Sequence, residues 1–178
     1  MGKRVILTLA LLTFASATSL HAQSSSAASP TMTLTVPQVA SISVSNFTIG
    51  TSTNPGNFAS SLQGNVTLNY TVRVPQSGSP NAKITVQSAS TSLTAGTSGS
   101  TAPGVTSIQY SAAASGTGVT PTTSWQNLSG TTAGTLVTFA AGTKVNSGTA
   151  TASFRITDSP TYDADTFTLP LTFTISSQ

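Results

Sequence analysis

Apolar side chains alternate with threonine or serine along most of this sequence. In residues 166–176, the clearest stretch, the apolar positions are Phe167, Leu169, Leu171, Phe173 and Ile175, and the positions between them are mostly threonine. Alternation with a period of two puts the apolar residues on one face of a β-strand, whereas a helix needs a period of 3.6. Threonine suits the outer positions because its branched Cβ fits the pleated surface of a sheet. The pattern therefore predicts an all-β protein.

Turn-forming residues divide this pattern into short segments, and no stretch has the period of an amphipathic helix of useful length. Turns or loops are predicted over residues 50–64, 75–80, 93–104 and 115–121. Strands are predicted over residues 31–36, 39–44, 65–74, 82–86, 105–112, 123–128, 135–140, 149–157 and 166–176. About seven to nine short strands without helices predict a single immunoglobulin-like antiparallel β-sandwich over residues 31–178. A closed barrel is the alternative arrangement.

The hydroxyl content of the chain raises a different possibility. The sequence contains 34 threonines and 29 serines among 178 residues, a bias that also occurs in disordered, mucin-like stalks. A stalk has few apolar residues, whereas 37% of this chain is hydrophobic and the apolar positions alternate regularly. A folded sandwich therefore explains the composition better than a stalk does.

The first 22 residues have the parts of a secretory signal peptide. Lys3 and Arg4 form a positive start, residues 5–17 are almost entirely apolar or small, and small residues lead to a cleavage site after residue 22. Residues 23–30 are rich in serine and alanine and are expected to form a flexible tail. The leader predicts a secreted protein located in the periplasm, at the cell surface or outside the cell.

No segment after the leader approaches the ~18 unbroken apolar residues that a membrane-spanning helix requires. We therefore expect no transmembrane segment in the mature chain.

After residue 22 the sequence contains no histidine, cysteine or glutamate. The charged residues that remain are Arg73, Lys83, Lys144, Arg155, Asp158, Asp163 and Asp165. Most enzyme mechanisms need a group that titrates near neutral pH or a strong nucleophile, so we expect no enzyme activity. The few basic residues are scattered, which is unlike a nucleic-acid-binding surface. A net charge near zero instead favours association with other protein surfaces or with copies of itself.

Three carboxylates lie in one eight-residue stretch: Asp158, Asp163 and Asp165. Calcium prefers several oxygen ligands, and such a loop between two strands could supply part of that shell. The spacing does not match an EF-hand loop. Aspartate is also common in turns because its side chain caps nearby backbone N–H groups. The loop is therefore a candidate calcium site, with a purely structural turn as the alternative.

Trp125 is the single tryptophan and a candidate ligand-binding residue. Together with Tyr110 and Tyr162 it could form an aromatic platform for a glycan. A lone tryptophan in a sandwich is also commonly a core residue between the two sheets. Both interpretations of Trp125 stay open from the sequence.

The first predicted strand, residues 31–36, is separated from the rest of the domain by Pro37. Its apolar residues Met32, Leu34 and Val36 share one face. The strand could fold back on its own domain, or it could add to a sheet of a neighbouring subunit.

This layout resembles bacterial pilin-type and spore-coat-like secreted sandwiches. The similarity lies in the leader, the detached N-terminal strand, residues 44–50 (Val-Ser-Asn-Phe-Thr-Ile-Gly) and the ending over residues 162–176. The resemblance implies a non-enzymatic structural or adhesive cell-surface subunit, of fimbrial type, that assembles with itself or other subunits by donor-strand exchange. The chain lacks the cysteine pair of several such families, and Pro170 in the last strand suits an edge or a bulge. A secreted module that binds a glycan or calcium is the alternative function.

Overall fold

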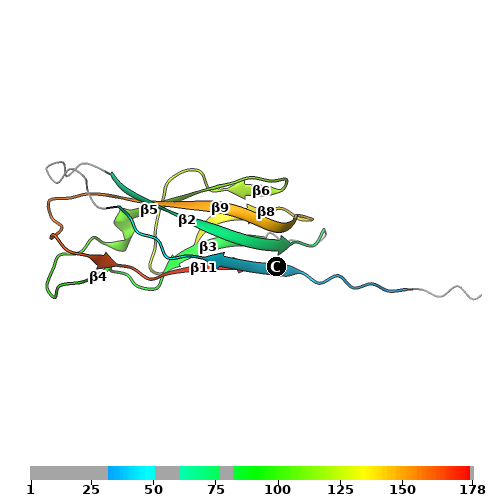
Figure 1. Ribbon diagram of the computed structural model, residues 1–178, viewed down its shortest axis with the longest axis horizontal. Coiled ribbons are helices and arrows are strands. Elements are labelled where there is room, and N and C mark those ends of the chain that lie inside the picture. The colour runs from blue at the N-terminus through cyan, green and yellow to red at the C-terminus, as the bar shows by residue number, and fades with distance from the viewer. Residues whose placement is uncertain (1–31, 51–60, 77–81, 177–178) are drawn as a thin grey trace, which may run out of the picture. The chain divides into compact units, whose positions relative to one another are not determined.

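The structure is a computed structural model that describes residues 32–50, 61–76 and 82–176. The predicted signal peptide (1–22) and tail (23–30) lie outside the described residues. The chain divides into two units, residues 1–35 and residues 36–178, and every strand found in the described residues belongs to the second (Figure 1).

Two antiparallel sheets make up most of the second unit. Sheet I contains, in order of pairing, β1 (Val39–Val44), β2 (Ser61–Arg73), β9 (Lys144–Thr157), β5 (Ile108–Ala114) and β7 (Gln126–Asn127). Sheet II contains β11 (Leu171–Ser176), β3 (Ala82–Ser88), β8 (Gly134–Phe139) and β6 (Val119–Pro121). A small third sheet pairs β10 (Phe167–Thr168) with β4 (Thr94–Ala95). One 3₁₀ turn, Val105–Ser107, precedes β5.

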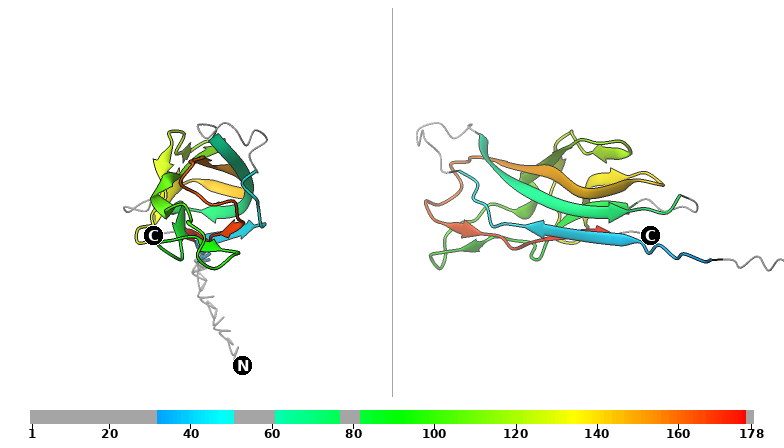
Figure 2. Two further views of the ribbon diagram at one scale, coloured as in Figure 1. Left: turned by 90° about the vertical axis from the view of Figure 1, so that its left-hand side faces the viewer. Right: turned by 45° about the vertical axis from the view of Figure 1, so that its right-hand side comes forward.

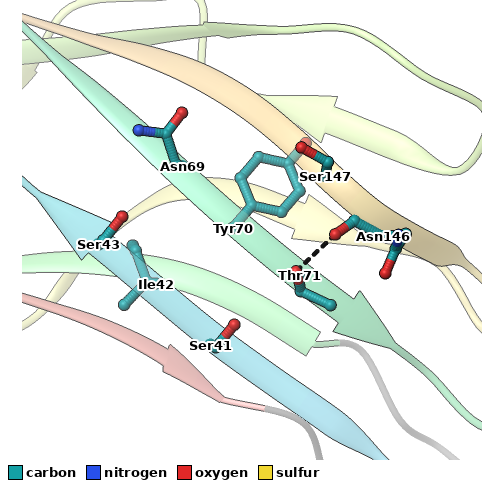
Figure 3. A pocket seen from close by; sticks show the side chains of 8 residues that line it. All are labelled: Ser41, Ile42, Ser43, Asn69, Tyr70, Thr71, Asn146 and Ser147. Carbon is teal, nitrogen blue, oxygen red and sulfur yellow. Dashed lines mark hydrogen bonds between the residues drawn. The ribbon is translucent and has the colours of Figure 1, made fainter.

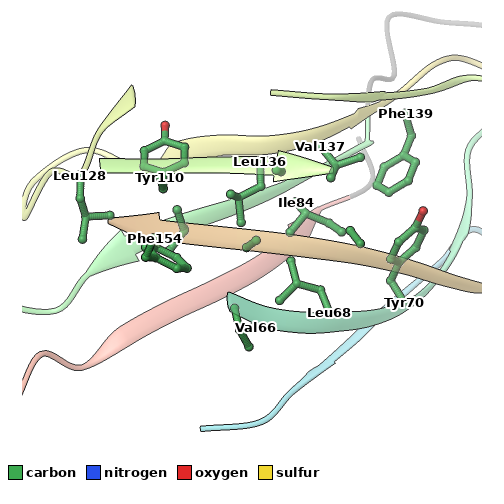
Figure 4. Packing of buried hydrophobic residues seen from close by; sticks show 14 of the residues in the cluster. Val66, Leu68, Tyr70, Ile84, Tyr110, Leu128, Leu136, Val137, Phe139 and Phe154 are labelled. Carbon is green, nitrogen blue, oxygen red and sulfur yellow. The ribbon is translucent and has the colours of Figure 1, made fainter. Parts of the chain in front are cut away.

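The hydrophobic core lies between sheets I and II (Figure 4). Alternate residues of the two longest strands are buried; in β2 these are Val66, Leu68, Tyr70 and Val72, and in β9 they are Ala150, Ala152, Phe154 and Ile156. The sheets meet at aromatic contacts such as that between Tyr70 of β2 and Phe139 of β8, whose ring centres are 5.1 Å apart. The predicted all-β sandwich is therefore confirmed.

The strand pairing does not confirm an immunoglobulin-like topology. That fold places its first, second, fifth and fourth strands in one sheet and the rest in the other. The order β1-β2-β9-β5 fits this rule only if β4, β6, β7 and β8 are left out of the count, so that β5 becomes the fourth strand and β9 the fifth. However, β8 is a strand of six residues that pairs with β3 in sheet II. The molecule is an antiparallel sandwich with its own connection pattern.

A β-bulge interrupts the pairing between β2 and β9. Tyr70 pairs with Gly148 and Val72 pairs with Val145, so one residue of β2 faces two residues of β9 across the bulge. The hydroxyl of Thr71 donates a 2.6 Å hydrogen bond to the carbonyl of Asn146, which ties the bulge to β2. Because the extra residue disrupts the alternation, sequence periodicity placed the start of this strand at residue 149 instead of Lys144.

Pro170 splits the predicted strand 166–176 into β10 and β11. Proline has no N–H to donate to a sheet ladder. Its carbonyl instead accepts a 3.0 Å hydrogen bond from the Ala89 backbone N–H. β11 is the edge strand of sheet II, so the expectation that Pro170 marks an edge or a bulge is confirmed.

Three short segments differ from the sequence prediction. Residues 115–121 were predicted as a turn but end in β6, and the predicted loop 93–104 contains β4. The strand predicted over 123–128 shrinks to the two residues of β7. Strands of two or three residues are too short to show a period, so their pairing depends on neighbours far away in the sequence.

The strand predicted over residues 31–36 is also not formed. Residues 32–38 belong to no strand, and Thr31 lies outside the described residues. Among the residues that the structure describes, none forms a helix long and apolar enough to cross a membrane.

Candidate functional site

Residues 32–36 present three large apolar side chains to solvent. Met32 is 88% exposed, Leu34 77% and Val36 57%. They recur at every second position, so in an extended chain they would project from one side. Exposed apolar side chains in such a row are typical of segments that bind another protein surface.

β11 carries a second row of incompletely buried apolar residues. Leu171, Phe173 and Ile175 face the core yet stay only half-buried. The ring of Phe173 meets the buried ring of Phe154 edge-on, with centres 6.2 Å apart. On its outer edge β11 pairs with no strand of the described residues. An edge strand of this kind offers free backbone N–H and C=O groups to an added strand.

β1 lies beside β11, although no backbone ladder joins them (Figures 1 and 2). β1 is itself the edge strand of sheet I, and of its apolar residues Ile42 is half-buried and Val44 is 38% exposed. We call the surface formed by these two edge strands the β1–β11 side. On this side, apolar residues of both sheets remain partly uncovered.

The acidic loop is attached to a second loop through its carboxylates. Asp163 Oδ2 accepts a 2.6 Å hydrogen bond from the Thr101 backbone N–H. Asp165 Oδ2 accepts one of 2.7 Å from the Thr97 N–H, and its Oδ1 accepts one of 2.7 Å from the Thr166 N–H. The hydrogen bond from Thr97 is the main reason that the pKa of Asp165 lies below its usual range. These carboxylates hold the loop after β9 against the loop between β4 and β5.

Asp158 has a more local role, since its Oδ1 accepts a 2.9 Å hydrogen bond from the neighbouring Ser159 N–H. Among the described residues, no three His, Cys, Asp or Glu side chains gather into a group that could hold a metal ion. The observed contacts are those of aspartates that cap backbone N–H groups in turns. Calcium binding by Asp158, Asp163 and Asp165 stays a prediction.

Trp125 lies on the outer face of sheet I. It is half-buried and outside the core cluster, so the interpretation as a core tryptophan is wrong. The guanidinium carbon of Arg155 lies 4.2 Å from the centre of the Trp125 ring, and Arg155 Nε donates a 2.9 Å hydrogen bond to Gln109 Oε1. Gln109 in turn donates to Asn127 Oδ1 at 3.0 Å. Arg155 therefore covers part of the ring that a sugar would need.

The three aromatic residues predicted to form a platform do not lie together. Tyr110 points into the core and is 5% exposed, whereas Trp125 is on the opposite face of the same sheet. Tyr162 packs against the core from the acidic loop. A shared aromatic platform is therefore wrong, and glycan binding by Trp125 alone stays a prediction.

A hollow of about 270 Å³ opens at the β9 bulge (Figure 3). Strands β1, β2 and β9 supply the residues that line it: Ser41, Ile42, Ser43, Asn69, Tyr70, Thr71, Asn146 and Ser147. Tyr70 borders the hollow from β2, but its side chain faces the core, where its hydroxyl is buried without a hydrogen-bond partner among the described residues. Burial raises the pKa of this phenol. No local sequence pattern predicts this hollow, because it depends on the register between two strands more than seventy residues apart.

By its fold and surface, the protein is an antiparallel β-sandwich with a partly uncovered apolar side and a small polar hollow. Comparison of the chain with protein-family models, with curated proteins and with solved structures gave no match.

Proposed function

We propose that this protein is a secreted, non-enzymatic structural or adhesive subunit of a cell surface. In this proposal it self-associates by adding residues 32–36 of one copy, as a strand, to the β1–β11 side of another copy. The observation that carries the proposal is the row of exposed apolar side chains at Met32, Leu34 and Val36.

Burial of this row would supply the driving force. Fully burying a large apolar side chain stabilises a complex by roughly 1.5–3 kcal/mol. Three such side chains could offset part of the cost of ordering a short segment and of joining two molecules. The same segment in water gains nothing from its apolar residues, which is consistent with its lying outside any strand.

The β1–β11 side has the properties of an acceptor. The outer edge of β11 can supply the backbone hydrogen bonds of strand addition. Leu171, Phe173 and Ile175 leave apolar surface for alternate side chains of the added strand to cover. Beside β11, on the edge away from β3, no strand of the described residues is paired, so an added strand has room to form a ladder there.

The composition supports a structural role. After residue 22 there is no histidine, cysteine or glutamate, and the acidic and basic residues nearly balance. Such a chain has little means for acid–base or nucleophilic catalysis and little charge repulsion between copies. Its hydroxyl-rich surface is suited to close packing between subunits.

The test is the size of the protein starting at residue 23, measured by light scattering after gel filtration and by negative-stain microscopy. We expect oligomers or fibres that grow with concentration, and monomers when residues 23–36 are removed. Leu34→Asp should also give monomers, because its charge would be buried in the neighbour. Thr33→Asp is the matched control, since residue 33 projects to the other side and should still allow assembly.

Two results would contradict the proposal. Stable monomers at every concentration of the unaltered chain would exclude strand exchange. Equal loss of assembly in Leu34→Asp and Thr33→Asp would show that added charge, and not one apolar face, controls association.

A further inference from the structure

We infer that residues 45–50 form a displaceable strap. In a single copy they cover part of the apolar space between the two sheets, and they give up that place to the added strand of a second copy. The inference rests on the proposed function and describes how the β1–β11 side is regulated. We call residues 45–50, which directly follow β1 in the chain, the strap.

The strap enters the space between the sheets through Phe47. The ring of Phe47 stacks on the fully buried ring of Phe154, with ring centres 5.0 Å apart and planes inclined by 29°. Phe154 also contacts the ring of Phe173 on β11. In Figures 1 and 2 the segment that follows β1 continues along the side of the sandwich where β1 and β11 lie. The strap therefore covers apolar surface next to the proposed acceptor strand.

A glycine in β2 makes room for the strap. Gly64 pairs with Phe154, so its position faces the core, as does that of Val66 two residues later. A Cβ atom at residue 64 would lie 2.5 Å from the carbonyl oxygen of Thr48 and 2.9 Å from the Cα atom of Ile49. Glycine permits such a close approach of another backbone to a strand. The strap thus fills the place that a side chain would take in the inward row of β2.

The strap is weakly attached to the domain. It belongs to no strand, and among the described residues one backbone hydrogen bond outside the ladders holds it, from the Gly50 N–H to the Gln63 carbonyl at 3.1 Å. Phe47 and Ile49 pack against the core but stay half-buried, and the residues on either side of each are exposed. Segments with few buried contacts and few backbone hydrogen bonds open at a low cost in free energy. The strap can therefore leave without unpairing β2 from β9.

The strap and the proposed added strand carry the same pattern of apolar residues. Phe47 and Ile49 recur at two-residue spacing, as Met32, Leu34 and Val36 do. In an extended conformation either segment puts these side chains on one face. The added strand brings three of them and can also bond to the edge of β11 that no described strand occupies. Exchange therefore favours the added strand, whereas in a lone copy the strap keeps water from part of the apolar surface.

Competition between the two segments predicts the direction of a mutational effect. A molecule binds the added strand only while its strap is open, so the apparent affinity is reduced by the fraction of open molecules. Loosening the strap should therefore tighten binding, although the variant loses a contact in the core. If Phe47 were instead part of the acceptor surface, its truncation would weaken binding.

The experiment measures the binding of a fluorescent peptide of residues 30–38 by polarisation. The acceptor is the chain from residue 23 with Leu34→Asp, which should not donate its own strand. Phe47→Ala in this acceptor should tighten binding by about tenfold, and Phe47→Leu should give a smaller gain. Gly64→Ala should also tighten binding, because the added methyl group excludes the strap. A peptide that carries Leu34→Asp should bind to none of these proteins.

Two control variants separate strap opening from a general loss of stability. Gly130→Ala, in the loop between β7 and β8, introduces the same kind of clash with a crossing backbone, 2.6 Å from the carbonyl oxygen of Ser90. Leu128→Ala removes a fully buried side chain. Neither control should tighten binding, and circular dichroism checks that each variant is folded. Hydrogen exchange of the Gly50 amide, faster in Phe47→Ala than in the acceptor, reports opening of the strap without peptide.

Three results would overturn the inference. If Phe47→Ala and Gly64→Ala bind the peptide no more tightly than the acceptor does, the strap is not displaced, while strand addition stands. If Gly130→Ala or Leu128→Ala tightens binding equally, a general loss of stability is the cause. If no form of the protein binds the peptide, strand addition itself fails, and the proposed function fails with it.

Discussion

The guanidinium of Arg155 stacks on the ring of Trp125, with its central carbon 4.2 Å from the ring centre. The hydrogen bond from Arg155 Nε to Gln109 fixes the guanidinium in this position. The pair joins β9 to the short segment before β7. β7 itself is held to β5 by a ladder of only two residues. The stack therefore helps to hold a weakly paired edge of sheet I.

Arg155→Ala should loosen this edge. Cation–π contacts contribute about 0.5–1 kcal/mol at exposed sites, and the lost hydrogen bond to Gln109 adds about 1 kcal/mol. Urea unfolding should show this loss of stability, and the emission of Trp125, the only tryptophan, should shift to the red in the folded state. Arg73→Ala removes an exposed arginine elsewhere and should leave the emission unchanged. An unshifted spectrum in Arg155→Ala would mean that the stack does not persist in solution.

The contact between the acidic loop and Thr97 should be lost in acid. The pKa of Asp165 is lowered, chiefly by the hydrogen bond from the Thr97 N–H. The stabilising contact is therefore fully present above the ordinary carboxyl pKa of about 3.9, and it disappears as the pH falls through the lowered pKa of the folded chain. NMR signals of the Thr97 and Thr166 amides should follow this titration.

Asp165→Asn should abolish the titration of these two amides. Asp158→Asn is the control, because Asp158 bonds to Ser159 and not to the Thr97 loop. A midpoint at or above the ordinary carboxyl value would contradict the observed hydrogen bonds.

Tyr70→Phe should leave the free protein as stable as before or raise its stability by about 1 kcal/mol. The substitution removes a buried hydroxyl that has no described partner, and an unsatisfied buried group costs about 1–3 kcal/mol. The ring itself, with its contact to Phe139, is retained. Denaturant unfolding of both forms measures the difference. A clear loss of stability would show that the Tyr70 hydroxyl forms a hydrogen bond with a bound water.

The two phenylalanines at the junction of β9 and β11 should differ in their contribution to stability. Phe154 is fully buried, so Phe154→Ala should destabilise the monomer by about 3–5 kcal/mol. Phe173 is only half-buried, so Phe173→Leu should cost the monomer much less while weakening assembly at the β1–β11 side. Unfolding of the chain that lacks residues 23–36 isolates the monomer effect. If Phe173→Leu and Phe154→Ala lowered the stability of the truncated chain equally, β11 would already be covered in the monomer.

Periodicity predicted which face of a strand is buried, and it succeeded where strands are long. The inward faces of β2 and β9 follow the alternation directly. In β11 the same pattern predicted the face correctly but not the depth of burial. Depth depends on whether another strand covers the residue, and the neighbour of an edge strand is not encoded in its own sequence.

The candidate sites were predicted less well, because each depends on contacts between distant residues. The acidic loop was located by its three aspartates, yet the partners of Asp163 and Asp165 lie 62 and 68 residues away. The sequence left open whether Trp125 is an outer or a core residue, and its stacking on Arg155 follows from strand pairing. The hollow beside Tyr70 follows from a register shift that no local pattern reveals.

The β9 bulge also has a consequence for how this chain can change in length. Elsewhere in a strand, deleting one residue turns every following side chain to the opposite face. At the bulge the inward positions Val145 and Gly148 are three residues apart instead of two, as their pairing with Val72 and Tyr70 shows. Deleting Asn146 would restore plain alternation and leave both halves of β9 facing as they do now. Residues 146–147 are thus a place in β9 where evolution or an engineer can shorten the strand without turning the core outward.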